Sequence, residues 1–464
     1  MQASLHNTAP LRQRVAVIGG GWAGMAAAVE LVQRGHEVHV WEMARHWGGR
    51  ARAMPVTDAS GHTFTLDNGQ HILIGAYTEC LRLMRTVGIA PERALLRLPL
   101  DLRDAQGMGL QLPDLPPPWN ALAGIARAKG WSWKDKCALL AHATRWKAAQ
   151  FQCTADATVA QLCAGLPRAL LRDFIDPLCI SALNLPAEQA SGQVFLRVLR
   201  DALFAGTGGS DLLIPRVDLG TLFPSTAAAW LMQHGAQLHL GQRVQQLSPL
   251  WPSAPSSRLR WAVDAEAFDA VVLATSSTEA ARLAMQGAAQ LPHAAAQAQG
   301  QQWAAVAHAL PHTAITTVYA RQTGPVRALP APMVALRSSA HAPAQFAFDR
   351  GQLEGSKGLL ALVISASDTL ADMDRARIEQ AALAQAQEQL QLPGLELLRT
   401  VVEKRATFAC TPHIHRPAQA VAPQLWACGD YIDGPYPATL EGAVRSGVQA
   451  AHQLKLLSCS NEHA

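Results

Sequence analysis

The sequence predicts an α/β fold in which a Rossmann-like nucleotide-binding domain is combined with a mixed-sheet domain and a helical insertion. One observation is the order of strand, glycine-rich turn, helix and strand over residues 14–42. Another is the return of strand-like alternation in the middle and near the end of the chain. The third is the length of 464 residues, which is too long for one ordinary core and predicts two or three domains.

The segment 14–42 shows the strongest local pattern. The apolar run at 15–18 predicts a strand buried in a parallel sheet, and 38–41 predicts the next strand. Between them Ala23, Ala27 and Leu31 recur at helical spacing, and Gly35 marks the end of the predicted helix.

Changes in composition mark the predicted domain boundaries. Prolines cluster just after residue 112, before a long and mainly helical stretch that runs to about residue 210. Further strands are expected at 235–240, 268–275, 313–319, 359–365 and 425–430, and helices at 374–392 and 440–457. The predicted nucleotide-binding domain consists of 1–111, 235–285 and 416–464, the helical region of 112–234, and the substrate domain of 286–415.

Composition limits the class of protein. Hydrophobic residues make up 49% and charged residues 16%, yet no run reaches the ~18 apolar residues of a membrane span. The segment 1–14 lacks the apolar core of a secretory signal. The eight cysteines form no C-x-x-C pair, which argues for reduced thiols and no metal site, and a net charge of +4 argues against nucleic acid as a partner. We expect a cytoplasmic protein, either soluble or peripheral on the inner face of the membrane.

A glycine motif follows the first predicted strand. Gly19, Gly21 and Gly24 fit G-x-G-x-x-G at the start of the predicted helix. Gly19 would permit the tight turn, Gly21 would let backbone N–H groups approach a pyrophosphate, and Gly24 would let the helix pack closely on the strand. Glu42, at the end of the second predicted strand, is expected to accept hydrogen bonds from a ribose. This context predicts a dinucleotide site.

A second glycine pair favours FAD over NAD. It precedes an arginine in Trp47-Gly48-Gly49-Arg50, a pattern that suits a longer ligand with its own phosphates. We expect Gly49 and Arg50 to contact the cofactor, with Arg50 binding phosphate through paired hydrogen bonds.

The carboxy-terminal part supplies a second set of candidate cofactor contacts. Gly429 and Asp430 follow a predicted strand, and Asp430 is expected to bind the ribityl chain or phosphate. The N–H groups of Gly442 and Ala443 are expected to face the flavin, where a helix end stabilises negative charge. Glu441 fits equally well as an ordinary acidic residue of a first helical turn.

These motifs together resemble those of the flavin amine oxidase and phytoene desaturase superfamily, and the match brackets nearly the whole chain. The resemblance implies a two-dinucleotide-binding-domain flavoprotein with an FAD domain and a substrate domain. It also places Val244, in the strand-like 242–244, where relatives offer backbone to the adenine. The segments 67–77, 403–408 and 437–447 are more specifically similar to the hydroxysqualene dehydroxylase branch, although Tyr436 is bulky where an aliphatic residue is expected.

The resemblance to that branch implies hydride transfer from reduced FAD to hydroxysqualene, loss of water and release of squalene for hopanoid or related triterpene synthesis. An acid is expected to protonate the leaving oxygen. Asp67, His71 and Glu441 lie in the matching motifs and are the candidates. A turn-forming role for Asp67 and a packing role for His71 remain open.

An apolar substrate implies collection from a bilayer or from an upstream synthase of the squalene pathway. Within 112–234, tryptophans alternate with basic residues, a mixture expected of an amphipathic segment on anionic lipid. A basic helical cap with tryptophans in its core fits equally well. The residues are Trp119, Trp131, Trp133, Trp146, Arg127, Lys129, Lys134, Lys136, Arg145 and Lys147.

Three other functions share the cofactor motifs. A carotenoid-type desaturase would transfer hydride in the opposite direction, from hydrocarbon to oxidised flavin. An amine oxidase would favour a pocket with polar and aromatic contacts, which the 4 tyrosines of the chain argue against. A flavin-containing binding protein without turnover is the third.

Overall fold

The structure is a computed structural model that describes residues 12–57, 61, 63–204, 206–251, 259–370 and 372–454. The chain divides into two compact units, each assembled from segments that are distant in sequence. Unit 1 comprises Met1–Gly49, Phe223–Ala309 and Arg416–Ala464, and unit 2 comprises Arg50–Leu222 and Leu310–His415. The last break coincides with the predicted boundary after residue 415, whereas the first lies after Gly49 and not after residue 111.

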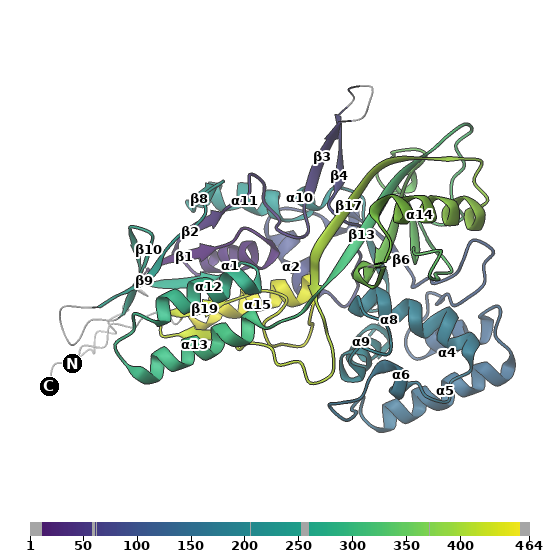
Figure 1. Cartoon of the computed structure of the whole chain (residues 1–464), viewed down its shortest axis with the longest axis horizontal. Helices are drawn as coiled ribbons and strands as arrows, with labels where there is room; N and C mark the ends of the chain where they lie inside the picture. Colours follow the sequence, from purple (N-terminus) through teal and green to yellow (C-terminus); the bar gives the residue numbers. More distant parts are fainter. Residues whose placement is uncertain are drawn as a thin grey trace, which may run out of the picture. The chain divides into compact units, whose positions relative to one another are not determined.

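Unit 1 contains a six-stranded sheet of Rossmann type (Figure 1). Its central strands pair in parallel and only β18 is antiparallel, as expected where helices connect consecutive strands. The order is β18 (Ala420–Ala422), β19 (Leu425–Ala427), β12 (Ala270–Leu273), β1 (Arg14–Ile18), β2 (Glu37–Glu42) and β8 (Gln237–Leu240). The α/β prediction and the strands at 15–18 and 38–41 are therefore confirmed.

Helices and a small sheet complete unit 1. Close packing of α15 on α1 depends on Gly447, because a Cβ atom there would lie 2.3 Å from the Ala23 carbonyl oxygen. The helices are α1 (Trp22–Gln33), α11 (Pro224–Gln233), α12 (Ser277–Ala288), α13 (Ala294–His308) and α15 (Leu440–Gln453). An antiparallel sheet contains β9 (Leu247–Leu250), β10 (Arg260–Val263) and β11 (Glu266–Phe268).

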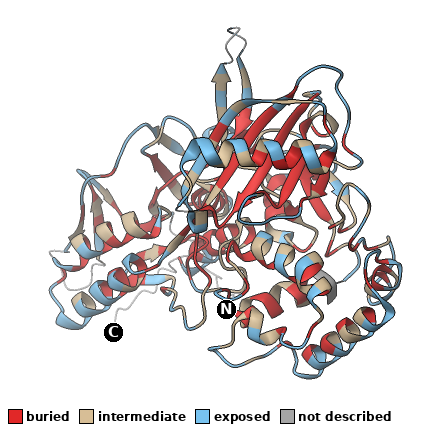
Figure 2. Cartoon of the chain, turned by 45° about the vertical axis from the view of Figure 1, so that its right-hand side comes forward, coloured by how far each residue is buried: buried red, intermediate tan, exposed pale blue. Residues whose placement is uncertain are grey.

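The main sheet of unit 2 is antiparallel and has five strands. Its order is β14 (Met333–Ala335), β15 (Phe346–Asp349), β16 (Leu359–Ser365), β13 (His312–Gln322) and β17 (Leu395–Phe408). Helix α14 (Arg375–Leu390) buries Ala382 and Ala386 against this sheet, and Figure 2 shows the buried strands behind the exposed outer side of the helix. β17 is a long strand that was not among the strands predicted from the sequence.

The rest of unit 2 is the helical insertion and two small sheets (Figure 1). The mainly helical character predicted for this region is confirmed. The sheets contain β3 (Ala53–Thr57) with β4 (Thr63–Asp67), and β5 (Leu73–Ile74), β7 (Leu212–Pro215) and β6 (Leu95–Leu98). The helices are α2 (Thr78–Thr86), α3 (Pro91–Ala94), α4 (Trp119–Arg127), α5 (Trp133–Ala148), α6 (Val159–Leu162), α7 (Arg168–Leu170), η1 (Leu171–Ile175, a π-helical turn), α8 (Asp176–Leu183), α9 (Gly192–Phe204) and α10 (Leu219–Leu222), and the 3₁₀ turns are η2 (Arg350–Gln352) and η3 (Ser367–Leu370).

Candidate functional site

The first and third glycines of the motif are required by protein packing. Gly19 has φ +115°, and a Cβ atom on it would lie 2.4 Å from the Ala274 carbonyl oxygen. A Cβ atom on Gly24 would lie only 1.9 Å from the carbonyl oxygen of Gly19. The turn and the first turn of α1 are thus pressed together, as the sequence predicted.

Gly21 has a different environment. A Cβ atom there would make only ordinary contacts, the nearest at 3.8 Å from the Gly49 Cα. Gly21 is also the N-cap of α1, which has no side-chain cap and no acidic residue in its first turn. An uncapped helix start behind an open glycine fits a phosphate group, because its N–H groups and the helix dipole favour an anion.

The second glycine pair lies beside the first. The Gly48 N–H donates to the Gly20 carbonyl oxygen at 2.9 Å, and Gly21 and Gly48 form a β-bridge. Gly49 adopts φ +60°, a left-handed conformation that favours glycine. The structure therefore brings Gly49 to the edge of the glycine turn at residues 19–24.

Glu42 anchors this turn. Its two carboxylate oxygens accept the N–H groups of Gly20 at 2.8 Å and of Ala44 at 2.7 Å. The side chain is buried at the end of β2. Because a carboxylate offers about four acceptor positions, Glu42 can still accept ribose hydroxyls.

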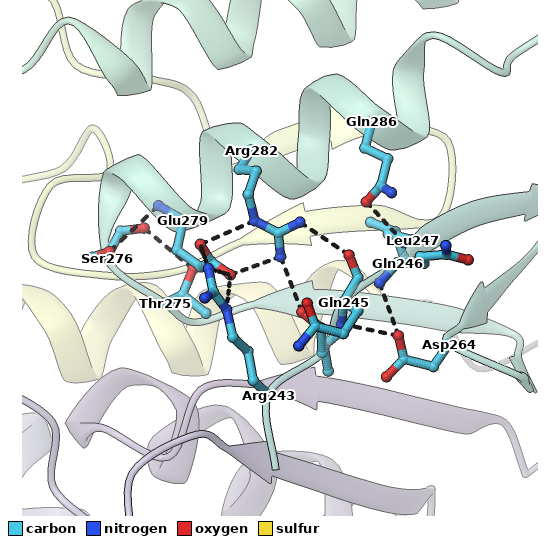
Figure 3. A network of polar contacts seen from close by, with 11 residues as sticks. Arg243, Gln245, Gln246, Leu247, Asp264, Thr275, Ser276, Glu279, Arg282 and Gln286 are labelled. Atoms are coloured by element: carbon cyan, nitrogen blue, oxygen red, sulfur yellow. Dashed lines mark hydrogen bonds and ion pairs between the residues drawn. The ribbon is translucent and has the colours of Figure 1, made fainter.

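The segment around Val244 is a loop and not the strand that the sequence suggested, because β8 already ends at Leu240. The Arg282 guanidinium of α12 donates to the carbonyl oxygens of Val244 and Gln245, both at 3.0 Å. Figure 3 shows Arg282 between Glu279 and Gln245. Glu279 accepts from Arg282 at 2.8 Å, and this bond lowers the pKa of Glu279. The Val244 N–H has no acceptor among the described residues, which fits a place beside an adenine edge.

At the carboxy-terminal motif, Thr439 caps the first turn of α15. The N–H of Gly442 donates to Thr439 Oγ1 at 3.0 Å, and that of Ala443 donates to the Thr439 carbonyl oxygen at 3.0 Å. These N–H groups therefore have partners within the start of α15, and their proximity to the flavin stays a prediction. Gly442 is required because a Cβ atom would lie 1.8 Å from the Tyr436 carbonyl oxygen.

Asp430 and Glu441 are both buried in unit 1. The Gly429 N–H donates to Ser446 Oγ at 2.8 Å, which fixes the chain next to Asp430. Glu441 accepts from Arg445 Nε at 2.7 Å, one helical turn later. The Arg445 guanidinium also lies 4.8 Å from the centre of the Tyr436 ring, so the unexpected aromatic residue has a cation–π partner.

In unit 2, Asp67 belongs to a buried charge cluster. One carboxylate oxygen accepts the Leu219 N–H at 2.8 Å, and the other lies 3.4 Å from two nitrogens of Arg350. Arg350 is itself buried and also pairs with Glu354. Burial raises the pKa of Asp67 to about 6 even though the Arg350 charge opposes the shift.

His71 lies in the same turn. Desolvation and the nearby Arg50 guanidinium lower the pKa of His71 to about 4, so its ring is neutral at neutral pH. Arg50 itself donates to the Ala406 carbonyl oxygen at 3.0 Å.

Sequence reasoning missed the polar partners of this turn. Arg350 also donates to Gln70 Oε1 at 2.7 Å, and the Tyr319 hydroxyl donates to the Asp67 carbonyl oxygen at 2.9 Å. Buried Gln70 Nε2 and Thr317 Oγ1 have no protein partner among the described residues. A methyl group added at Gly69 would lie 3.8 Å from Thr317 Oγ1 and 3.9 Å from His71 Nε2. No local sequence pattern predicts these partners, because Arg350, Tyr319 and Thr317 lie far along the chain from the turn.

Fold and cofactor motifs define an FAD-dependent oxidoreductase, and the comparisons with known proteins give its family. Residues 22–455 match the family of flavin containing amine oxidoreductases, and the chain belongs to that family. The glycine turn, Glu42 and the Val244 loop are the residues of unit 1 that fit FAD.

Among curated relatives, the chain is similar over its whole length to hydroxysqualene dehydroxylases. It is 28% identical to that of Rhodopseudomonas palustris over 95% of this chain and 98% of the relative. It is 26% identical to that of Sinorhizobium fredii over 95% and 97%. A zeta-carotene desaturase of Capsicum annuum is 40% identical, but over 75 residues that span 16% of this chain and 12% of the relative.

Solved structures of low identity share the fold. An oxidoreductase from Methanosarcina mazei aligns with a TM-score of 0.66 at 17% identity, covering 95% of this chain and 99% of that one. A wild-type putrescine oxidase bound to putrescine aligns with a TM-score of 0.64 at 15% identity, covering 96% and 99%.

Proposed function

We propose that the protein converts hydroxysqualene to squalene in hopanoid or related triterpene synthesis. The observation that carries this proposal is the end-to-end similarity to two hydroxysqualene dehydroxylases, which covers 95% of this chain and at least 97% of each relative. The match to a zeta-carotene desaturase covers only 16% of this chain. An apolar isoprenoid alcohol is therefore the substrate class that the relatives support.

The proposed reaction replaces a C–O bond by a C–H bond. Bound reduced FAD supplies the hydride. One proton must be added to the hydroxyl oxygen so that it leaves as water, and the oxidised cofactor, the hydrocarbon and water are the products. The chain therefore has to bind the cofactor, exclude bulk water from the reacting carbon and deliver one proton.

The candidate proton donors differ in their surroundings. Asp67, with a pKa of about 6, is partly protonated near neutral pH, but its oxygens already contact Leu219 and Arg350. His71 is neutral and can only act through its neutral imidazole. Glu441 is paired with Arg445. All three remain proposals, and the partnerless Gln70 Nε2 and Thr317 Oγ1 are further candidates to hydrogen-bond the leaving oxygen.

The test is a single-turnover experiment. The flavin is reduced anaerobically, hydroxysqualene is added, and flavin reoxidation is followed by absorbance while squalene is measured by mass spectrometry. We expect squalene and oxidised flavin in equal amounts. Reoxidation without squalene would contradict the proposal.

The second candidate is carotenoid-type desaturation, supported by the local similarity to zeta-carotene desaturases. In that case oxidised enzyme should be reduced by phytoene or zeta-carotene, and reduced enzyme should not react with hydroxysqualene. The two functions therefore predict opposite changes in the flavin spectrum.

A further inference from the structure

The four tryptophans of the helical insertion fall into two groups. Trp131 and Trp146 are only 6% and 8% exposed and belong to the core of unit 2. Trp119 and Trp133, by contrast, are 63% and 70% exposed. Two of the four tryptophans are thus core residues, as expected for a helical cap. Of the four, only Trp119 and Trp133 are accessible to a partner.

Helix α4 places an apolar face outward. Trp119, Leu122 and Ala126 recur at spacings of three and four residues, and all three are exposed. The opposite side buries Gly124 and Ile125, and a Cβ atom at Gly124 would lie 2.7 Å from Leu112. A helix on a solvated surface normally carries polar residues on its outer face, so this face lacks an apolar partner within unit 2.

Helix α5 adds its exposed tryptophan next to this face. Lys136 Nζ donates to the Ala126 carbonyl oxygen at 2.8 Å and lies 4.9 Å from the centre of the Trp133 ring. Lys136 is buried, so it positions Trp133 beside the last turn of α4 and is not a surface cation. In Figure 1, α4 and α5 lie next to each other in the helical part of unit 2.

The charge around these side chains is positive. Arg127, Lys129 and Lys134 are exposed at the α4–α5 junction, and they form no ion pair with a carboxylate of the described residues. Asp135, in the same junction, is used in the capping box of α5 with Ser132. Exposed Arg145 and Lys147 extend the positive charge along α5.

We propose that this surface, the α4–α5 face, binds an anionic lipid bilayer. It consists of Trp119, Leu122, Trp133, Arg127, Lys129 and Lys134. Indole rings and a leucine insert at the level of the headgroups, and the cations bind acidic headgroups. No helix of the described residues has the length and hydropathy of a membrane span.

The inference deepens the proposed function, since a bilayer is a source of an apolar isoprenoid, but its test needs no substrate. The FAD-loaded full chain is mixed with phosphatidylcholine vesicles with or without phosphatidylglycerol and floated on a density gradient. We expect flotation with anionic vesicles and at least a tenfold weaker effect with neutral ones. Failure of turnover on hydroxysqualene would leave this result unchanged, so the two proposals fail separately.

Matched variants locate the contact. Trp119→Ala with Trp133→Ala, and separately Lys129→Glu with Lys134→Glu, should each reduce flotation at least tenfold while the flavin absorbance stays unchanged. The controls are Trp251→Ala, an exposed tryptophan of unit 1, and Lys404→Glu, an exposed lysine of β17; both should float like wild type.

Two results would overturn the proposal. One is wild-type protein that stays at the bottom of the gradient with anionic vesicles. The other is flotation that the α4–α5 variants leave unchanged. A third outcome combines two observations: the wild type is a dimer that Trp119→Ala converts to a monomer, and no variant changes flotation. In that case the face binds a second copy of the chain instead.

Discussion

At the scale of residues, glycines of one motif serve two different purposes. Gly24 is fixed by the protein itself, because a Cβ atom would lie 1.9 Å from a backbone oxygen. Gly21 has room for a methyl group, with its nearest neighbour at 3.8 Å, and an extended backbone that alanine adopts freely. We therefore propose that the open space beside Gly21 receives the cofactor.

This difference predicts opposite behaviour of two alanine variants. Gly21→Ala should fold with a melting temperature of the cofactor-free protein close to wild type but bind FAD at least tenfold more weakly. Gly24→Ala should lose stability even without FAD. Thermal unfolding of both cofactor-free proteins and FAD titration measure the two effects. A Gly21→Ala protein that binds FAD like wild type would exclude close phosphate approach at this residue.

Asp67 makes stability depend on pH. Its folded-state pKa of about 6 lies above the ordinary value of 3.8, so the folded protein holds a proton that the unfolded chain releases. The resulting stabilisation is fully present below about pH 4 and is lost as the pH rises through 6.

The expected effect is a fall of about 2 kcal/mol in the free energy of unfolding of wild type relative to Asp67→Asn between pH 4 and 6.5, because one pKa unit corresponds to about 1.4 kcal/mol and titration is incomplete at both ends of this range. Urea denaturation across this range measures it. Asparagine keeps an acceptor for the Leu219 N–H but has no ionisable group. The variant therefore preserves this hydrogen bond while it removes the titration. Parallel pH curves for the two proteins would show that Asp67 is not buried as an acid.

At the scale of elements, helix α12 determines the shape of the loop that contains Val244. One arginine of the helix binds two successive carbonyl oxygens, and Asp264 Oδ1 accepts the N–H groups of Gln245 and Gln246 at 2.9 and 2.8 Å (Figure 3). The loop is therefore held from both sides while its Val244 N–H is left available.

Arg282→Met should loosen this loop. We expect about tenfold weaker FAD binding, since two hydrogen bonds from a charged group are lost, each worth on the order of 1 kcal/mol or more. The control Arg260→Met removes a surface ion pair with Asp269 in the same unit and should leave FAD binding unchanged. Fluorescence titration of the cofactor-free proteins gives both dissociation constants. If Arg282→Met and Arg260→Met bind FAD with equal affinity, the loop is not part of the cofactor site.

At the scale of the whole molecule, the residues proposed to bind the cofactor are distributed over distant segments. Gly21 and Glu42 come from the first segment of unit 1, Val244 from its second and Asp430 from its third. A ligand that contacts all of them stabilises the folded state by mass action.

Removal of FAD should therefore lower the melting temperature. Free FAD at 100 times its dissociation constant stabilises the folded protein by about 2.7 kcal/mol, and adding it back should restore the transition. Differential scanning calorimetry of loaded, stripped and reloaded protein measures this. NAD serves as the control ligand and should produce no comparable shift. If the melting temperature were the same with and without FAD, the cofactor would not bind the folded protein in preference to the unfolded chain.

The sequence by itself determined the parts that depend on neighbours along the chain. The strands at 15–18 and 38–41, the glycine turn and the choice of FAD follow from apolar runs and from glycines whose role is local. Short motifs also showed a resemblance to the hydroxysqualene dehydroxylase branch, and two curated relatives of that name align with 95% of the chain. The tertiary structure alone decided the rest. Arg350, which lies 283 residues away in sequence, contacts Asp67. Thr439 accepts the Gly442 N–H that was expected to face the flavin. Packing buries two tryptophans of the helical insertion and leaves two exposed. Partners, burial and pKa values arise from contacts between distant segments, and no local pattern encodes such contacts.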